Sequence, residues 1–151
     1  MRRVEYMMGG EDFKVMTAGH FMQTEIYYYS ENAMATDLIG AMTMGGFGSV
    51  PITRAKTLVG IVSEFDLLKA IIGGKDMKKI TAADVMTKYP VTVVETTPAE
   101  KIMSLLQEKH LIRVPVVDAK GELIGVVARR DILHGFLKSL ETPPPMSFNL
   151  L

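Results

Sequence analysis

Two aspartates, Asp66 and Asp131, occupy the same place in two similar stretches of the sequence. Each ends a seven-residue pattern that starts with glycine: GIVSEFD from Gly60 to Asp66, and GVVARRD from Gly125 to Asp131. In both stretches an apolar run stops and a helical pattern begins, so each carboxylate lies where a strand leads into a helix. The start of a helix exposes unpaired backbone N–H groups and attracts anions, so each junction is a candidate ligand-binding site. A carboxylate at this place also acts as a simple helix cap.

A predicted β-hairpin positions each aspartate. Before Asp131, the apolar runs 114–117 and 123–127 flank the polar turn 118–121, a combination typical of a hairpin. Before Asp66, the runs 50–53 and 58–62 flank a basic turn in the same way. After each aspartate the apolar residues recur at helical spacing: Leu67, Leu68, Ile71 and Ile72 in the first stretch, and Ile132, Leu133, Phe136, Leu137 and Leu140 in the second.

The chain therefore contains two copies of one unit, offset by about 65 to 70 residues. A Met-Thr pair after a valine lies upstream of each copy, at residues 15–17 and 85–87. Between them, aromatic and β-branched residues predict a strand at 25–29, and Ser30 is the predicted N-cap of a helix to about Met44. In the second copy we predict a strand at 91–94 and a capping box at 97–100, which opens a helix to about Lys109.

These ordered, doubled motifs resemble the tandem CBS domain pair, or Bateman module, over about residues 13–140. The resemblance implies an α/β (α+β) fold of two intertwined CBS repeats, each a small mixed sheet with two helices, packed through their sheets. The expected organisation is an N-terminal arm at 1–12, CBS repeat 1 at 13–74, CBS repeat 2 at 75–140 and a Pro-rich C-terminal tail at 141–151. Three prolines prevent the tail from continuing a helix, and its apolar end could dock on another surface.

By this resemblance, Asp66 and Asp131 accept hydrogen bonds from the ribose hydroxyls of an adenosine-containing ligand. The family prefers Ser or Thr three residues earlier for a ribose or phosphate contact, and Ser63 matches whereas Ala128 does not. Arg129 and Arg130 could supply charge in its place, or form a solvated helix start. Arg113 resembles a phosphate-contacting position, and its counterpart in repeat 1 is Ser49. The two sites are therefore expected to be unequal.

The resemblance also implies which residues hold the base. Backbone groups and apolar walls would come from Val50 and Pro51 in repeat 1, and from Pro90, Val91, Thr92, Val114 and Pro115 in repeat 2. Proline removes a backbone donor and fixes φ, which leaves neighbouring carbonyls and amides for an adenine edge. The alternative role for these seven residues is strand and core packing.

Composition narrows the function classes. Lys+Arg equals Asp+Glu, so no overall field attracts nucleic acid or an anionic membrane, and nucleic-acid binding is not expected. The absence of cysteine excludes disulfides, thiolate metal sites and a cysteine nucleophile, and favours an intracellular, cytoplasmic location. No apolar run is long enough to span a membrane. The histidines match no metal or catalytic spacing, and nucleotide-binding and hydrolase motifs are absent, so we predict no catalytic residues, no metal and no enzyme activity.

The predicted function is therefore sensing. An adenine nucleotide (AMP, ADP or ATP) would bind in the cleft between the CBS repeats as a regulatory ligand, with no cofactor required. The module, expected to be a homodimer shaped as a flat disc, would signal to a partner protein that the sequence does not identify. The alternatives are a sensor of an S-adenosylmethionine-type ligand, which needs no phosphate contact, and a ligand-free dimerisation or nucleic-acid-binding module.

Overall fold

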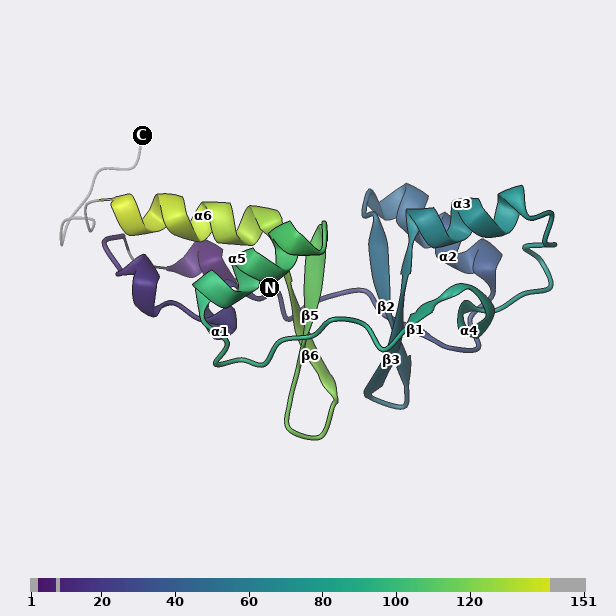
Figure 1. Ribbon diagram of the computed structural model, residues 1–151, viewed down its shortest axis with the longest axis horizontal. Helices are drawn as coiled ribbons and strands as arrows, with labels where there is room; N and C mark the ends of the chain where they lie inside the picture. Colours follow the sequence, from purple (N-terminus) through teal and green to yellow (C-terminus); the bar gives the residue numbers. More distant parts are fainter. Residues whose placement is uncertain (1–2, 8, 142–151) are drawn as a thin grey trace. The chain divides into compact units, whose positions relative to one another are not determined.

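The computed structural model describes residues 3–7 and 9–141, which form two compact units (Figure 1). The central unit comprises Tyr27–Thr92 and Val117–Ile124. The terminal unit comprises the chain before Tyr27, Val93–Val116 and the chain from Gly125 onwards. Each unit therefore combines segments that are far apart in the sequence.

A mixed sheet of four strands forms the centre of the central unit, in the order β1-β2-β3-β4. The strands are β1 (Tyr29–Ser30), β2 (Ser49–Arg54), β3 (Thr57–Ser63) and β4 (Thr87–Lys88). β1 is parallel to β2, whereas the β2–β3 and β3–β4 pairs are antiparallel. The predicted hairpin before Asp66 is thus confirmed. Val50, Pro51 and Ile52 are buried consecutively, so both faces of β2 are covered.

Three helices complete the central unit: α2 (Ala35–Gly45), α3 (Glu64–Ile72) and α4 (Ala82–Val85). Their buried residues pack with those of β2 and β3 into one cluster, Ala35, Leu38, Met42, Val50, Ile52, Val62, Leu67 and Ala82. Each fully buried aliphatic side chain contributes about 1.5–3 kcal/mol to folding. α2 ends at Gly46, whose φ of 69° is left-handed and therefore suits glycine.

The terminal unit contains mainly helices. They are the 3-10 helices η1 (Arg3–Tyr6) and η2 (Phe13–Val15), and the α-helices α1 (Ala18–Phe21), α5 (Ala99–Glu108) and α6 (Arg129–Leu140). Val4 is fully buried, so the described part of the N-terminal arm is packed against the unit. Residues 142–151 of the predicted tail lie outside the described residues.

The second predicted hairpin is also confirmed. β5 (Arg113–Val117) and β6 (Leu123–Ala128) form a two-stranded sheet joined by the predicted polar turn. The Asp118 carboxylate accepts from the N–H groups of Lys120 and Glu122, both at 2.9 Å, and Gly121 has a φ of 81°. These short-range bonds explain why the turn was visible in the sequence.

Each repeat contributes its lead-in segment to the unit that holds most of the other repeat. In the terminal unit, the N–H of Ala99 at the start of α5 donates to the carbonyl of Met16, at 3.0 Å. In the central unit, the N–H of Ala35 at the start of α2 donates to the carbonyl of Ile80, at 2.9 Å. The exchange confirms that the repeats are intertwined.

The same contacts reveal the register of the duplication, which is a shift of 64 positions through this part of the chain. Met16 corresponds to Ile80, and Ala35 corresponds to Ala99, so the two hydrogen bonds are equivalent in the two repeats. The parallel pair Tyr29↔Ile52 likewise recurs as Val93↔Val116. The duplication itself is therefore confirmed.

The predicted pairing of residues 15–17 with 85–87 is wrong. Thr17 precedes the short helix α1, whereas Met86 and Thr87 follow the short helix α4. The counterpart of Thr17 is Thr81, and the counterpart of Thr87 is Gln23. The two Val-Met-Thr triplets are identical in sequence, but one precedes its one-turn helix and the other follows its one-turn helix. A helix of four residues is too short to show a helical period in the sequence.

Four predicted boundaries also differ from the structure. The strand at 25–29 is reduced to β1, and the strand at 91–94 is a single bridge at Val93. Ser30 is not a helix cap, because α2 starts after Met34. The capping box at 97–100 is absent, since Pro98 is the N-cap and Thr97 Oγ1 accepts from the N–H of Val94 instead. In both helices a carbonyl of the exchanged lead-in segment binds the first N–H, so no side-chain cap is needed there.

Among the residues described, no helix combines the length and the apolar character needed to cross a membrane.

Candidate functional site

A capping box forms the junction between β3 and α3. The N–H and the hydroxyl of Ser63 both donate to Oδ2 of Asp66, at 2.8 and 3.0 Å, and the N–H of Asp66 donates to Ser63 Oγ at 3.2 Å. These reciprocal bonds satisfy backbone donors of the first helical turn and fix the orientation of the carboxylate. Asp66 therefore has a structural role, and its other oxygen, Oδ1, faces further partners.

One such partner comes from the second repeat. The Thr87 hydroxyl in β4 donates to Oδ1 of Asp66, at 3.2 Å. Gly60 permits this approach, because a Cβ at that position would lie 2.5 Å from Met86 Sδ and 3.0 Å from the Thr87 carbonyl oxygen. The glycine of the repeated motif thus leaves room for Met86 and Thr87 where the exchanged strand β4 pairs with β3. Sequence reasoning missed Thr87, since its partner lies 21 positions away.

A pocket of about 440 Å³ lies beside Asp66 and Thr87. Lys69, Lys75 and Asp84 also line it, so both signs of charge are present. The backbone N–H of Thr81 and then its hydroxyl bind the Asp84 carboxylate, which holds the pKa of Asp84 below its ordinary value. Such a pocket suits a polar ligand with both hydroxyl and anionic groups.

A second pocket, of about 310 Å³, lies beside Lys88 of β4, and Met86 lines both pockets. Its walls include Leu58, Tyr89 and Pro90, with Lys88 and Arg54 as cations. Tyr89 has a φ of 53° and is 94% exposed. A left-handed backbone is uncommon for a bulky residue and marks a turn or a strained position. The sequence singled out Pro90 here but not Tyr89.

The equivalent junction in the terminal unit is closed. Asp131 is 0% exposed, and its Oδ2 accepts from the Ala128 N–H at 2.8 Å and from Gln23 Nε2 at 3.2 Å. Gln23 thus takes the place that Thr87 has beside Asp66. Gly125 again permits close approach, since its Cβ would lie 2.8 Å from the Gln23 carbonyl oxygen. In this conformation Asp131 presents no surface to a ligand.

The predicted arginines lie in the terminal unit. Arg113 opens β5 as Ser49 opens β2, which confirms that these two positions are counterparts. Arg129 and Arg130 are exposed in the first turn of α6, and Arg129 Nε donates to the Leu111 carbonyl at 2.6 Å. Their side chains are thus not in the unit that contains Ser63 and Asp66.

The predicted base-binding residues fall into two groups. Val50, Pro51, Val114 and Pro115 are buried in their strands, so a ligand would reach backbone groups rather than their side chains. Pro90 and Val91 are half-buried and Thr92 is exposed. These last three belong to the central unit, with Asp66, whereas Val114 and Pro115 belong to the terminal unit with Asp131. The exchange of segments therefore changes which residues accompany each acid.

Comparison with known proteins identifies the repeated unit. A family model described as the CBS domain matches residues 18–73 and 82–138. The two matches begin 64 positions apart, which is the shift that relates the hydrogen bonds of the two units. Together they cover most of the chain.

Curated relatives include two archaeal proteins without an assigned function. An uncharacterized protein of Methanopyrus kandleri is 32% identical over 121 residues, which are 79% of this chain and 62% of the relative. An uncharacterized protein of Methanocaldococcus jannaschii is 28% identical over 134 residues, 87% of this chain and 47% of the relative. This chain therefore spans only about half to three-fifths of the length of these relatives.

Solved structures share the fold. The crystal structure of CBSX2 in complex with AMP is 30% identical, with a TM-score of 0.72 over 81% of this chain and 96% of that chain. CBSX2 is a CBS-pair protein from Arabidopsis thaliana. A CBS domain pair in complex with 5′-methylthioadenosine and S-adenosyl-L-methionine is 22% identical, with a TM-score of 0.71 and coverages of 81% and 96%. From the two family matches and the intertwined α/β fold, this chain belongs to the CBS domain family, as a tandem pair of CBS repeats.

Proposed function

We propose that this chain is a regulatory module that binds an adenosine-containing ligand, AMP, ADP or ATP, at Asp66 and signals to a partner protein. The observation that carries the proposal is the half-buried Asp66 carboxylate, whose Oδ1 accepts from the hydroxyl of Thr87. The Thr87 hydroxyl shows that Oδ1 can accept a hydrogen bond from a hydroxyl group, as it would from a ligand. The binding of AMP by CBSX2, 30% identical to this chain, supports an adenine nucleotide.

The ribose would bind at Oδ1 of Asp66. A carboxylate is an acceptor with about four lone-pair sites. Two bonds from Ser63 use Oδ2, and one from Thr87 uses Oδ1, so Oδ1 retains acceptor capacity. Because Ser63 holds the carboxylate in a capping box, the acceptor is oriented before the ligand arrives, which lowers the entropic cost of binding.

The base and the phosphate would lie along β4. The Tyr89 ring, Pro90 and Leu58 form an apolar wall suited to a planar base, and Lys88 supplies a cation for phosphate. Arg54 is already paired with Glu31 by two hydrogen bonds of 2.7 and 2.8 Å. This pair holds the pKa of Glu31 below its ordinary value. Lys88 is therefore the better candidate for phosphate.

A second site at Asp131 remains a prediction, with Arg113, Arg129 and Arg130 as its cations and Val114 and Pro115 beside its base. It requires the Gln23 side chain to leave Asp131. A ligand favours a conformation only by the difference in its affinity for the two states. A ligand would therefore bind the second site more weakly than the first, by the free energy that this movement costs.

Asp66→Ala is expected to weaken AMP or ATP binding by about 10- to 100-fold, because a charge-assisted hydrogen bond is worth about 1.5–3 kcal/mol. Isothermal titration calorimetry measures the loss. For the unmodified chain, a ligand at about 100 times its Kd adds about 2.7 kcal/mol, or about 5–10 °C in Tm.

The matched control is Asp37→Ala, which removes an exposed aspartate from the first turn of α2. It should leave binding unchanged. A thermal shift with S-adenosylmethionine alone would instead support a sensor of that ligand class. No shift with AMP, ATP or S-adenosylmethionine would contradict ligand sensing and favour a dimerisation module.

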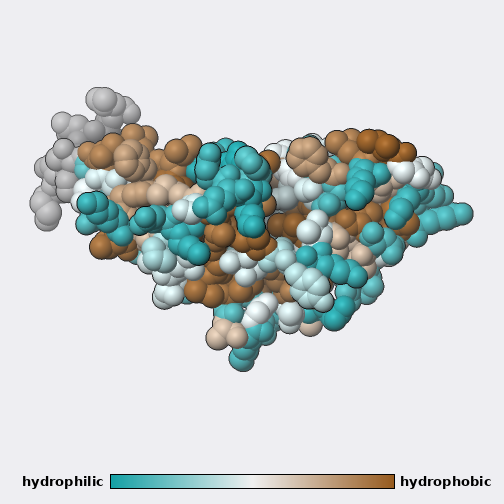
Figure 2. All heavy atoms as spheres, viewed as in Figure 1, coloured by the Kyte–Doolittle hydropathy of each residue, from teal (hydrophilic) through white to brown (hydrophobic). Residues whose placement is uncertain are grey.

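A homodimer is proposed through the exposed face of α3. Phe65, Leu68 and Ile72 recur at helical spacing and are 82%, 54% and 85% exposed. Figure 2 shows hydrophobic side chains gathered over this helix. A contiguous apolar surface of this kind marks an interaction site.

The double substitution Phe65→Ser, Ile72→Ser is therefore expected to convert a dimer to a monomer in sedimentation equilibrium. The control is Met44→Ser, because Met44 in α2 is also apolar and 91% exposed. This substitution should leave the mass of the dimer unchanged. A monomeric unmodified chain at high concentration would contradict the proposal.

A further inference from the structure

Thr87 and Gln23 occupy equivalent positions beside the two acids. Thr87 of β4 pairs with Ile61 in the antiparallel β3–β4 ladder. Gln23 forms the corresponding antiparallel bridge with Val126. Ile61 and Val126 each follow the glycine of the repeated motif. The two side chains therefore reach their acids from the same register position, and the two sites can be compared side chain by side chain.

These two side chains differ in length, and their acids differ in exposure. The Thr87 hydroxyl is attached to Cβ and donates to Oδ1 of Asp66, at 3.2 Å, and Asp66 remains half-buried. The Gln23 amide is carried on a longer side chain and donates to Oδ2 of Asp131, at 3.2 Å. Asp131 is fully buried. The longer side chain thus lies against the acid that is closed to solvent.

Gln23 is itself only half-buried, in contrast to the acid that it contacts. Part of its side chain therefore faces water, and a change of rotamer can withdraw the amide while the backbone bridge to Val126 stays in place. The amide N–H donates to the carboxylate as a ligand hydroxyl would, since both are uncharged hydrogen-bond donors. The Gln23 side chain thus occupies a position that a ligand at Asp131 would need.

We propose that Gln23 is a side-chain cover over Asp131, and that the residue type at this register position decides which acid is open to a ligand. The inference rests on the proposed function, because it assigns the adenosine-containing ligand to the acid with the shorter neighbour. A ligand must displace Gln23 before it reaches Asp131, whereas Thr87 leaves part of Asp66 accessible. The two sites therefore fill in a fixed order, with Asp66 first.

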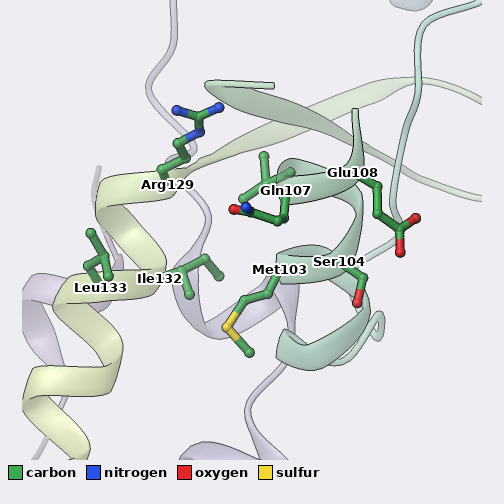
Figure 3. A pocket seen from close by; sticks show the side chains of 8 residues that line it. Met103, Ser104, Gln107, Glu108, Arg129, Ile132 and Leu133 are labelled. Atoms are coloured by element: carbon green, nitrogen blue, oxygen red, sulfur yellow. The ribbon is translucent and has the colours of Figure 1, made fainter. Parts of the chain in front are cut away.

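Carbodiimide labelling of carboxylates in the full chain, quantified by mass spectrometry, measures the access of each acid without any ligand. Gln23→Thr gives the terminal unit the shorter side chain. It should raise the labelling rate of Asp131 by about tenfold or more, the factor that a hydrogen bond to a charged group is worth. The matched control is Gln107→Thr, because Gln107 is an exposed glutamine of the same unit and lines a pocket between α5 and α6 (Figure 3). It should leave the labelling of Asp131 unchanged.

The reverse replacement, Thr87→Gln, gives the central unit the longer side chain. It should lower the labelling rate of Asp66 and weaken AMP binding, each by about tenfold. Unfolding cannot imitate this result, because unfolding exposes carboxylates. The matched control is Thr43→Gln, on an exposed threonine of α2, which should change neither quantity.

Unchanged labelling of Asp131 in the Gln23→Thr chain, or of Asp66 in the Thr87→Gln chain, would overturn the proposal. Equal labelling of the two acids in the unmodified chain would overturn it as well. In the Gln23→Thr chain, AMP should protect Asp131 as well as Asp66 from labelling, and protection of Asp66 alone would count against the role of Gln23. Failure of AMP to protect Asp66 in the unmodified chain would contradict the proposed function alone, because the comparison of labelling rates needs no ligand.

Discussion

Asp131→Ala is expected to lower the Tm of the chain by about 5–15 °C. The fully buried carboxylate accepts from the Ala128 N–H and from the Gln23 amide, and alanine leaves both donors without this partner. A buried donor left unsatisfied costs about 1–3 kcal/mol, so the free energy of unfolding should fall by about 2–4 kcal/mol. For a chain of this size each kcal/mol is worth about 2–4 °C. Thermal and urea unfolding measure the loss.

Asp66→Ala is the matched comparison, because it removes the same helix-start carboxylate from a half-buried position. Water can replace the lost bonds there, so we expect a smaller loss, about 1 kcal/mol, typical of a capping interaction. The two substitutions should thus have different main effects. Asp66→Ala should mainly reduce nucleotide binding, whereas Asp131→Ala should mainly reduce stability. Equal losses of stability would show that Asp131 is as accessible as Asp66, contrary to the structure.

Gly125→Ala is expected to destabilise the chain by about 2–3 kcal/mol, since overpacking a closed site costs about 1–3 kcal/mol. The new Cβ would lie 2.8 Å from the carbonyl oxygen of Gln23. That oxygen is backbone, and it accepts from the Val126 N–H at 3.1 Å, while the Gln23 N–H donates to the Val126 carbonyl at 2.8 Å. Relief of the clash would therefore break this bridge and displace the Gln23 side chain from Asp131. Chemical denaturation measures the change.

Alanine substitutions at two other glycines serve as controls for this prediction. At Gly60 the nearest atom to the new Cβ is the flexible Met86 side chain, so Gly60→Ala should cost less than Gly125→Ala. At Gly40, within α2, nothing lies within 4 Å, and alanine should stabilise the helix by about 0.5–1 kcal/mol. Reversal of the order between Gly125 and Gly40 would contradict the close approach of the exchanged segments.

Much of the fold was predictable because its signals are local. The two hairpins and helices α3 and α6 each follow from an apolar run, a polar turn and a helical period within about ten residues. The helix starts at α2 and α5 were misassigned for a physical reason. Sequence signals favour Ser30 and Thr97 as caps, but carbonyls of Ile80 and Met16, from the other repeat, bind the first backbone donors instead.

The candidate site was only partly predictable. Ser63 and Asp66 were identified because they lie three residues apart at one junction. Thr87 and Gln23 lie 21 and 108 positions from the acids they contact, and no short motif links them. The left-handed backbone of Tyr89 has no signature in the sequence, because tyrosine rarely adopts it. Distant partners and strained backbone are set by packing.

The sequence by itself determined the duplication, the two hairpins and the placing of an acid at the start of a helix in each repeat. Only the tertiary structure decided that these acids differ in access, with Asp66 half-buried beside a threonine and Asp131 fully buried under a glutamine. The physical reason is the exchange of lead-in segments. Strand and helix patterns depend on neighbours along the chain, whereas the cover over each carboxylate comes from the other repeat.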